Sequence, residues 1–191
     1  MSDIYAAKDF TSLLGLPGFS DTLLNNHFAL YQGYVKNTNA LTALLKTKET
    51  GTPEYAELHR RFGWEWNGMR LHELYFENLG KEATELGEGL LKEKIEQAWG
   101  SLENWQKDFS GIAAMRGIGW VVLAWDTASG ALFSTWINEH DLGHLAGTVP
   151  LIVLDVFEHA YLTDYGIKKA EYLETFFRAI DWKIVEKRLV Q

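Results

Sequence analysis

The segment PLIVLDVFEHAY, residues 150–161, runs from an almost wholly apolar stretch directly into a carboxylate and an imidazole. Residues 150–154 have the pattern of a buried strand, and Asp155 and His159 follow where that strand ends. Burying an ionised carboxylate is costly unless a cation or hydrogen bonds compensate. A metal ion shared with a histidine four residues further on would compensate. The segment therefore predicts a metal site at the end of a strand.

This segment resembles the DxWEHAY signature of iron/manganese superoxide dismutases, with Phe157 where that family usually has Trp. Two further histidines lie in segments that resemble the two long helices of the family, within residues 19–35 and 64–76. Three neutral imidazoles and one carboxylate suit a borderline first-row ion. The resemblance implies one iron or manganese ion, with iron favoured. The implied ligands are His27, His72, Asp155 and His159.

Each ligand has an ordinary structural explanation when it is taken alone. A histidine inside an apolar helical stripe, such as His27 or His72, is more often a hydrogen-bonded core residue. Asp155 could cap a helix expected to begin at about residue 157, and His159 could lie in a subunit contact. These explanations would be four independent accidents. Their joint occurrence in the order of the family favours the metal site.

Length and composition fit one large domain or two small domains. The chain of 191 residues has no Cys, which excludes disulfides and thiolate ligands and fits a reducing compartment. Its net charge of −8 argues against nucleic acid as a partner. No apolar run approaches the ~20 residues of a membrane span, and the N-terminus lacks the features of a signal peptide. We therefore expect a cytoplasmic protein that binds neither nucleic acid nor membrane.

Hydrophobic periodicity predicts two long helices, from Asp21 to about Lys48 and from Pro53 to about Leu79, joined by a short turn. The expected fold class is α+β, an N-terminal antiparallel helical hairpin followed by an α/β domain with a three-stranded antiparallel sheet. We expect the two domains to span residues 1–82 and 83–191. The other expected elements are strands at 119–125, 131–137 and 148–154, and helices at 90–99, 102–115, from about 157, 168–179 and 182–189.

The resemblance also implies two candidate catalytic residues, Tyr34 and His140. In the family, a Gln or a His hydrogen-bonds the solvent beside the metal. One subgroup supplies a Gln four residues before the second ligand, where this chain has Gly68. His140, in the loop after the second strand, matches the position that other members use, so the chain resembles the His-bearing variety. The alternative is that His140 is an ordinary loop residue, as we expect for His144.

Tyr34 resembles the gateway tyrosine of the family, but it follows His27 by seven residues where the family usually has eight. Seven residues of a regular α-helix return to within ~20° of the starting face, whereas eight need a π-bulge. We expect a helix without the bulge and with Tyr34 facing the metal. The cross-subunit His–Tyr pair of the family is replaced by Tyr31 and Leu162, so that gate is absent or rebuilt.

Other implied residues line the substrate channel or join subunits. Trp66, Trp120 and Phe157 are expected as apolar walls, with plain core packing as the alternative. Lys168 matches a basic residue near the channel mouth, where an anionic substrate needs positive charge. Glu158 matches a glutamate that reaches across a two-fold axis to the partner's last histidine ligand. We therefore expect a homodimer, or a dimer of such dimers.

The implied activity is dismutation of superoxide. Two other functions stay open from the residues alone. A non-haem iron oxygenase would use two histidines and one carboxylate, although a third histidine counts against it. A non-catalytic metal-binding dimer of the same fold is conceivable because the gate is altered.

Overall fold

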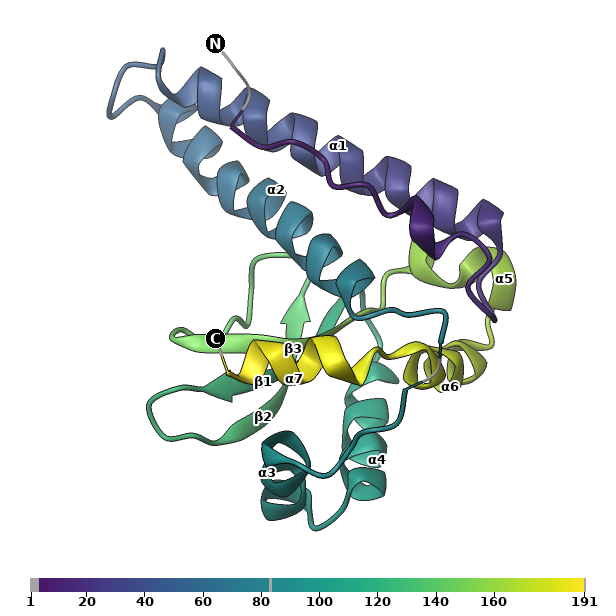
Figure 1. Ribbon diagram of the computed structural model, residues 1–191. Coiled ribbons are helices and arrows are strands. Elements are labelled where there is room, and N and C mark those ends of the chain that lie inside the picture. Colours follow the sequence, from purple (N-terminus) through teal and green to yellow (C-terminus); the bar gives the residue numbers. More distant parts are fainter. Residues whose placement is uncertain (1–3, 83, 191) are drawn as a thin grey trace.

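The computed structural model of the protein describes residues 4–82 and 84–190. Helices α1 (Asp21–Leu45) and α2 (Pro53–Glu77) lie antiparallel and form the N-terminal hairpin (Figure 1). The hydroxyl of Ser20 caps α1 by accepting from Leu23 N at 3.0 Å. Every residue of α1 is α-helical, so the helix has no π-bulge, as the seven-residue interval predicts.

The sheet contains three antiparallel strands in the order β2-β1-β3. They are β1 (Gly119–Asp126), β2 (Leu132–Asn138) and β3 (Thr148–Asp155). A Cβ on Gly119, whose φ is +151°, would lie 2.0 Å from the carbonyl oxygen of Ile137. Only glycine therefore lets β1 begin so close to β2. The register then pairs Trp120 with Asp155, which brings these two side chains to the same end of the sheet.

Helices cover the sheet on both sides. Helices α3 (Leu90–Trp99) and α4 (Leu102–Ala113) pack on β2, and α4 also contacts β1. On the other side, α2 and α7 (Trp182–Leu189) contact β3 (Figure 1). The remaining elements are the short 3₁₀ segments η1 (Thr11–Leu13) and η2 (Glu158–Ala160), and helices α5 (Leu162–Tyr165) and α6 (Lys169–Ala179).

The predicted α+β class is confirmed, and the two long helices end two or three residues earlier than predicted. The helix expected from about residue 157 is instead divided into η2 and α5. Among the described residues, no helix combines the length and the apolar composition that crossing a bilayer requires.

The edge of β3 that faces away from β1 is closed by side chains. Three alternate carbonyl oxygens on this edge accept hydrogen bonds from residues of α2, α6 and α7 or their ends. The pairs are Arg188 Nη1 to Leu151 O at 2.8 Å, Asn78 Nδ2 to Val153 O at 2.5 Å, and Tyr172 Oη to Asp155 O at 2.7 Å. These bonds tie the strand that carries Asp155 to three helices.

Candidate metal centre

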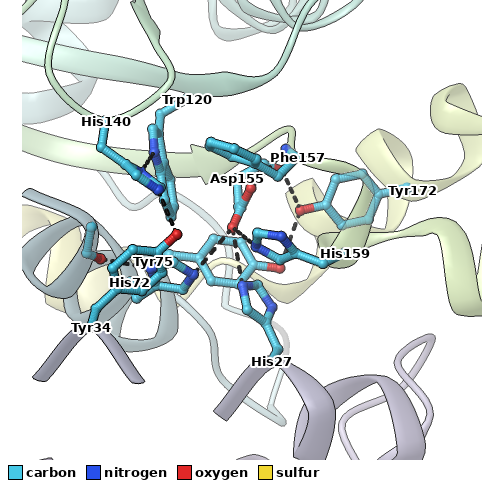
Figure 2. A network of polar contacts seen from close by, with 11 residues as sticks. His27, Tyr34, His72, Tyr75, Trp120, His140, Asp155, Phe157, His159 and Tyr172 are labelled. Carbon is cyan, nitrogen blue, oxygen red and sulfur yellow. Dashed lines mark hydrogen bonds and ion pairs between the residues drawn. The ribbon is translucent and has the colours of Figure 1, made fainter. Parts of the chain in front are cut away.

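Four side chains from four elements meet between the hairpin and the sheet (Figure 2). His27 comes from α1, His72 from α2, Asp155 from the last residue of β3, and His159 from η2. The Nε2 atoms of the three imidazoles lie 3.0, 3.7 and 3.1 Å from Asp155 Oδ2, in that order. One candidate ligand atom from each of the four residues lies within 4.8 Å of the others. The structure therefore brings all four predicted ligands together.

The hydrogen bonds of His72 indicate what this group of atoms binds. Its Nδ1 lies 2.6 Å from the carbonyl oxygen of Gly68 and donates to it, so Nε2 carries the lone pair. That Nε2 is buried and has no hydrogen-bond partner within the described chain. A buried, unpaired nitrogen aimed at a carboxylate is costly without a cation. Because ligand bonds to first-row metals are about 2 Å long, one iron or manganese ion fits among these atoms.

Burial and the mutual charges of the four side chains shift their pKa values in different directions. Burial lowers the pKa of His27 and of His72, which favours the neutral form that binds metal. Burial alone would raise the pKa of Asp155, but His159 and His27 outweigh it and hold this pKa below its usual range. Burial likewise disfavours charge on His159, yet the Asp155 carboxylate raises its pKa. The group therefore presents an anionic oxygen among three imidazoles.

Asp155 is held in place by its backbone as well as by its side chain. Its Oδ1 accepts from the backbone N–H of Phe157 at 2.8 Å, which leaves Oδ2 facing the imidazoles. Its carbonyl oxygen accepts from Tyr172, and the hydroxyl of Tyr75 lies 3.1 Å from the Tyr172 hydroxyl. The side chains of Asp155, Tyr75 and Tyr172 are all fully buried. The carboxylate is therefore oriented by groups that do not themselves reach the ligand atoms.

Tyr34 and His140 lie together beside the ligands (Figure 2). The Tyr34 hydroxyl is 2.7 Å from His140 Nε2, and Trp120 Nε1 donates to His140 Nδ1 at 3.0 Å. Burial raises the pKa of Tyr34 to about 12 and lowers the pKa of His140 to about 4, so both are neutral near pH 7. The Tyr34 ring stacks on His72 with a centroid separation of 5.1 Å. Tyr34 thus faces the cluster, as its spacing from His27 predicts.

Gly68 provides the space for the Tyr34 ring. A Cβ added at Gly68 would lie 2.6 Å from Cδ1 of Tyr34, closer than two carbon atoms can approach. While Tyr34 occupies this position, residue 68 can carry no side chain. The position of the Tyr34 ring therefore explains why residue 68 is a glycine and not a glutamine in this chain.

The loop that carries His140 is tightly constrained. Asn138 and Leu142 exchange backbone hydrogen bonds across it, and Glu139 adopts a left-handed φ of +50°, which is uncommon for a residue with a side chain. His144 Nε2 donates to the carbonyl oxygen of His140 at 2.9 Å. His144 therefore supports the loop from outside and does not join the cluster.

Two of the three predicted walls contact the centre. Trp120 packs edge-on against His72, and Phe157 stacks on both His140 and His159 at centroid separations of 4.8 and 5.2 Å. Trp66 lies elsewhere: its Nε1 donates to Tyr5 Oη at 3.3 Å and the Arg70 guanidinium lies over its ring. Trp64, which the sequence reasoning missed, packs edge-on against His140 at 4.8 Å. The four-residue spacing of 64, 68 and 72 puts them on one helix face, and residue 66 lies nearly opposite.

The charged and gate positions are more peripheral. Lys168 is exposed and pairs with Glu171 at 2.9 Å, whereas Lys169 lies over the Tyr161 ring at 5.8 Å. Burial lowers the pKa of Lys169 and the Asp155 carboxylate acts in the opposite direction, so Lys169 lies within electrostatic reach of the cluster. Glu158 is exposed and has no ion-pair partner among the residues that the structure describes.

The two residues at the altered gate lie apart from the ligands. Tyr31 is buried, donates to Glu73 Oε1 at 2.9 Å and accepts from Lys8 N at 2.9 Å. It therefore ties α1 to α2 and to the N-terminal segment. Leu162 is 48% exposed at the start of α5. Both residues therefore lie outside the group of candidate ligand atoms.

This fold and this cluster are typical of a metalloprotein: within residues 4–82 and 84–190, three histidines and one aspartate form a largely buried group able to hold one metal ion. The family of iron/manganese superoxide dismutases, C-terminal domain, matches residues 87–188. An iron superoxide dismutase of Cupriavidus metallidurans is 38% identical over 88% of this chain and 87% of its own length. A manganese superoxide dismutase of Haloferax volcanii is 34% identical over 87% and 84%, and an iron superoxide dismutase of Aquifex pyrophilus is 34% identical over 95% and 89%. The chain belongs to the iron/manganese superoxide dismutase family.

Proposed function

We propose that the protein is a superoxide dismutase that uses one iron or manganese ion bound by His27, His72, Asp155 and His159. The observation that carries this proposal is the convergence of three imidazole Nε2 atoms on one carboxylate oxygen in a buried site. Membership of the family supports dismutation over the oxygenase and over a non-catalytic role.

When bound, the ion supplies one-electron redox chemistry: one superoxide loses an electron and leaves as dioxygen, and another gains an electron and two protons and leaves as hydrogen peroxide. The residues of the chain set the conditions for this. The negative charge of Asp155 favours the trivalent ion, and the neutral imidazoles add no charge. Tyr34 and His140 hold hydrogen bonds beside the ligands, and Trp120 and Phe157 exclude bulk water with their rings.

The test is to strip the protein of metal, reload it separately with iron and with manganese, and measure superoxide consumption per bound ion. We expect stoichiometric binding and turnover with at least one metal, and we favour iron because the chain resembles the His-bearing variety. Stoichiometric metal without superoxide consumption in either form would contradict the proposal. Oxygen uptake that requires a 2-oxoacid would instead indicate the oxygenase.

We also propose that two subunits pair through the segment of Glu158 and His159. The Glu158 carboxylate is exposed, and the His159 side chain is the only ligand with appreciable exposure, at 24%. In a two-fold contact each glutamate can meet the partner subunit's His159. Leu30 and Leu162 are exposed apolar side chains, which a subunit contact would cover.

Sedimentation of Glu158→Ala tests this pairing. We expect weaker dimers and weaker metal retention, because the carboxylate would orient the imidazole of the partner. Glu103→Ala, which removes an exposed carboxylate from α4, is the control and should change neither. A fully active monomer at micromolar concentration would exclude the pairing. Whether two such dimers associate, whether the protein works in the cytoplasm, and whether residues 1–82 and 83–191 fold as separate domains stay predictions.

Positive charge near the centre is proposed to come from Lys169 together with Lys168. An anionic substrate on a chain of net charge −8 benefits from a local positive field. Lys169→Glu should lower kcat/KM for superoxide at low salt more than Lys168→Glu does, and added salt should reduce both effects. Lys107→Glu, an exposed change of equal charge on α4, is the control. If all three variants lowered kcat/KM equally, the effect would come from the net charge of the protein and not from the position of Lys168 or Lys169.

A further inference from the structure

The hydrogen bonds around His140 all run in one direction. Trp120 Nε1 lies 3.0 Å from His140 Nδ1, and an indole N–H can only donate. His140 Nδ1 must therefore carry a lone pair and no hydrogen. His140 is fully buried, with Phe157 stacked on its face and Trp64 edge-on, so its ring has no freedom to seek another partner.

The position of the remaining hydrogen follows from this. A neutral imidazole has one N–H, and since Nδ1 accepts, the hydrogen is on Nε2. That atom is 2.7 Å from the Tyr34 hydroxyl, so His140 donates and the Tyr34 oxygen accepts. The reverse arrangement would place a hydrogen on Nδ1 against the indole N–H. The hydroxyl hydrogen of Tyr34 is therefore directed away from His140.

We propose that Trp120 is a positioning residue that fixes His140 as the Nε2–H tautomer, and that Tyr34, not His140, is consequently the hydrogen-bond donor on this side of the metal centre. This inference rests on the proposed function and deepens it. A glutamine could serve two acceptors with its two N–H groups, but a histidine whose single N–H is used by Tyr34 cannot. Gly68 offers no side chain that could take over.

The hydrogen bonds from Trp120 to His140 and from His140 to Tyr34 cannot relay protons to the metal centre. If Tyr34 released its hydrogen and took one from His140, the imidazole would need a new hydrogen on Nδ1 or from Trp120. The Trp120 N–H blocks Nδ1 and has no lone pair with which to accept a proton. Trp120 and His140 therefore polarise and orient the Tyr34 hydroxyl, and Tyr34 must recover its hydrogen from solvent.

The first test reads the tautomer directly in metal-free protein labelled with ¹⁵N-histidine, by the chemical shifts and couplings of the two ring nitrogens. The His140 signals are assigned by their loss in His140→Gln. We expect the wild type to show Nε2–H alone, and Trp120→Phe to show a mixture that includes Nδ1–H. Trp105→Phe, which removes another buried indole whose nitrogen has no partner in the described chain, should leave the tautomer unchanged.

Two outcomes would overturn the inference, namely Nδ1–H in the wild type and an unchanged tautomer in Trp120→Phe. If Trp120→Phe does not fold, Tyr34→Phe replaces it. That variant removes the acceptor of Nε2–H but keeps the indole, so the Nε2–H tautomer should persist, and a change to Nδ1–H would equally overturn the inference.

The second test asks which group donates. Tyr34→Phe should lower turnover about tenfold in the wild type, as expected for the loss of one hydrogen bond, and clearly less in a His140→Gln background, where the amide has a spare N–H. Equal losses in both backgrounds would contradict the assignment of Tyr34. Inactivity of every metal-loaded variant would contradict the proposed function instead, and the tautomer measurement would be unaffected by it.

Discussion

The two sides of the centre are built on different principles. On the ligand side, three imidazoles from three elements converge on one carboxylate oxygen, Asp155 Oδ2, which a fourth element supplies. On the other side, His140 lies in a loop in which Glu139 has a left-handed φ, and its side chain hydrogen-bonds Tyr34 and Trp120 rather than a ligand. The ligand side depends on charge and on several mutually supporting contacts. The His140 side depends on the direction of single hydrogen atoms.

This difference predicts how each side fails. Removing a ligand takes away a bond to the ion, so the whole function is lost. Changes on the His140 side leave the ligand atoms in place and alter the hydrogen bonding around them. Metal content and turnover should therefore separate the two sides.

The largest effect is expected from the ligands. His72→Ala should abolish metal retention and superoxide consumption, and the same holds for His27, Asp155 and His159. Metal analysis of the purified variant, with activity measured in parallel, checks this. His59→Ala, an exposed histidine of the same helix, is the matched control and should keep both. Stoichiometric metal and full activity in a ligand variant would remove that residue from the site.

A smaller effect is expected from His140→Ala, which should keep the metal but lower turnover about 10- to 100-fold, the usual cost of losing a group that orients the centre. It should also change which metal supports activity. His144→Ala should do less, because His144 supports only the backbone carbonyl of residue 140. Unchanged metal preference and turnover in His140→Ala would show that the two sides are independent.

Two glycines of α2 give a third comparison. Gly63→Ala should stabilise the protein by up to about 1 kcal/mol, because alanine favours a helix and the Cβ meets nothing within 4 Å. Gly68→Ala should instead destabilise it by roughly 1–3 kcal/mol, because its Cβ collides with the Tyr34 ring. Denaturant unfolding of both variants measures the sign directly. Stabilisation by both would mean that Tyr34 can move without cost.

The smallest effect is expected from Tyr172→Phe, which leaves the Asp155 carbonyl oxygen without its side-chain donor. We expect a loss of about 1 kcal/mol in the free energy of unfolding and a modest loss of metal affinity. Tyr55→Phe, on the partly exposed start of α2, serves as the control. A metal affinity reduced as severely as in His72→Ala would place Tyr172 on a par with the ligands.

Much of the fold, and the grouping of the four candidate ligands in one place, could be predicted from the sequence. Long helices can be predicted from the local periodicity of their apolar residues, and Asp155 and His159 follow a strand that is apolar almost throughout. The secondary structure of residues 157–165 is harder to predict, because η2 and α5 are each about one turn long and show no hydrophobic periodicity.

Long-range contacts account for the rest. The resemblance indicates Trp66 as a wall, but the side chain that contacts His140 is Trp64, which lies on the same helix face as His72. Tyr172 meets the Asp155 carbonyl from α6, and no local pattern marks that contact. Lys168 is the N-cap residue of α6 and pairs with Glu171, whereas Lys169 begins α6 and lies over the Tyr161 ring. Such features are decided by tertiary packing, which a sequence pattern does not encode.

The closed edge of β3 has a consequence for self-association. An exposed strand edge is a template on which another chain can add a strand, and this is a common route to aggregation. Here Arg188, Asn78 and Tyr172 occupy the outward carbonyl oxygens of β3. A second strand would have to displace all three donors, including a buried guanidinium. The strand that delivers Asp155 is thereby protected from intermolecular pairing by the same hydrogen bonds that hold it in register.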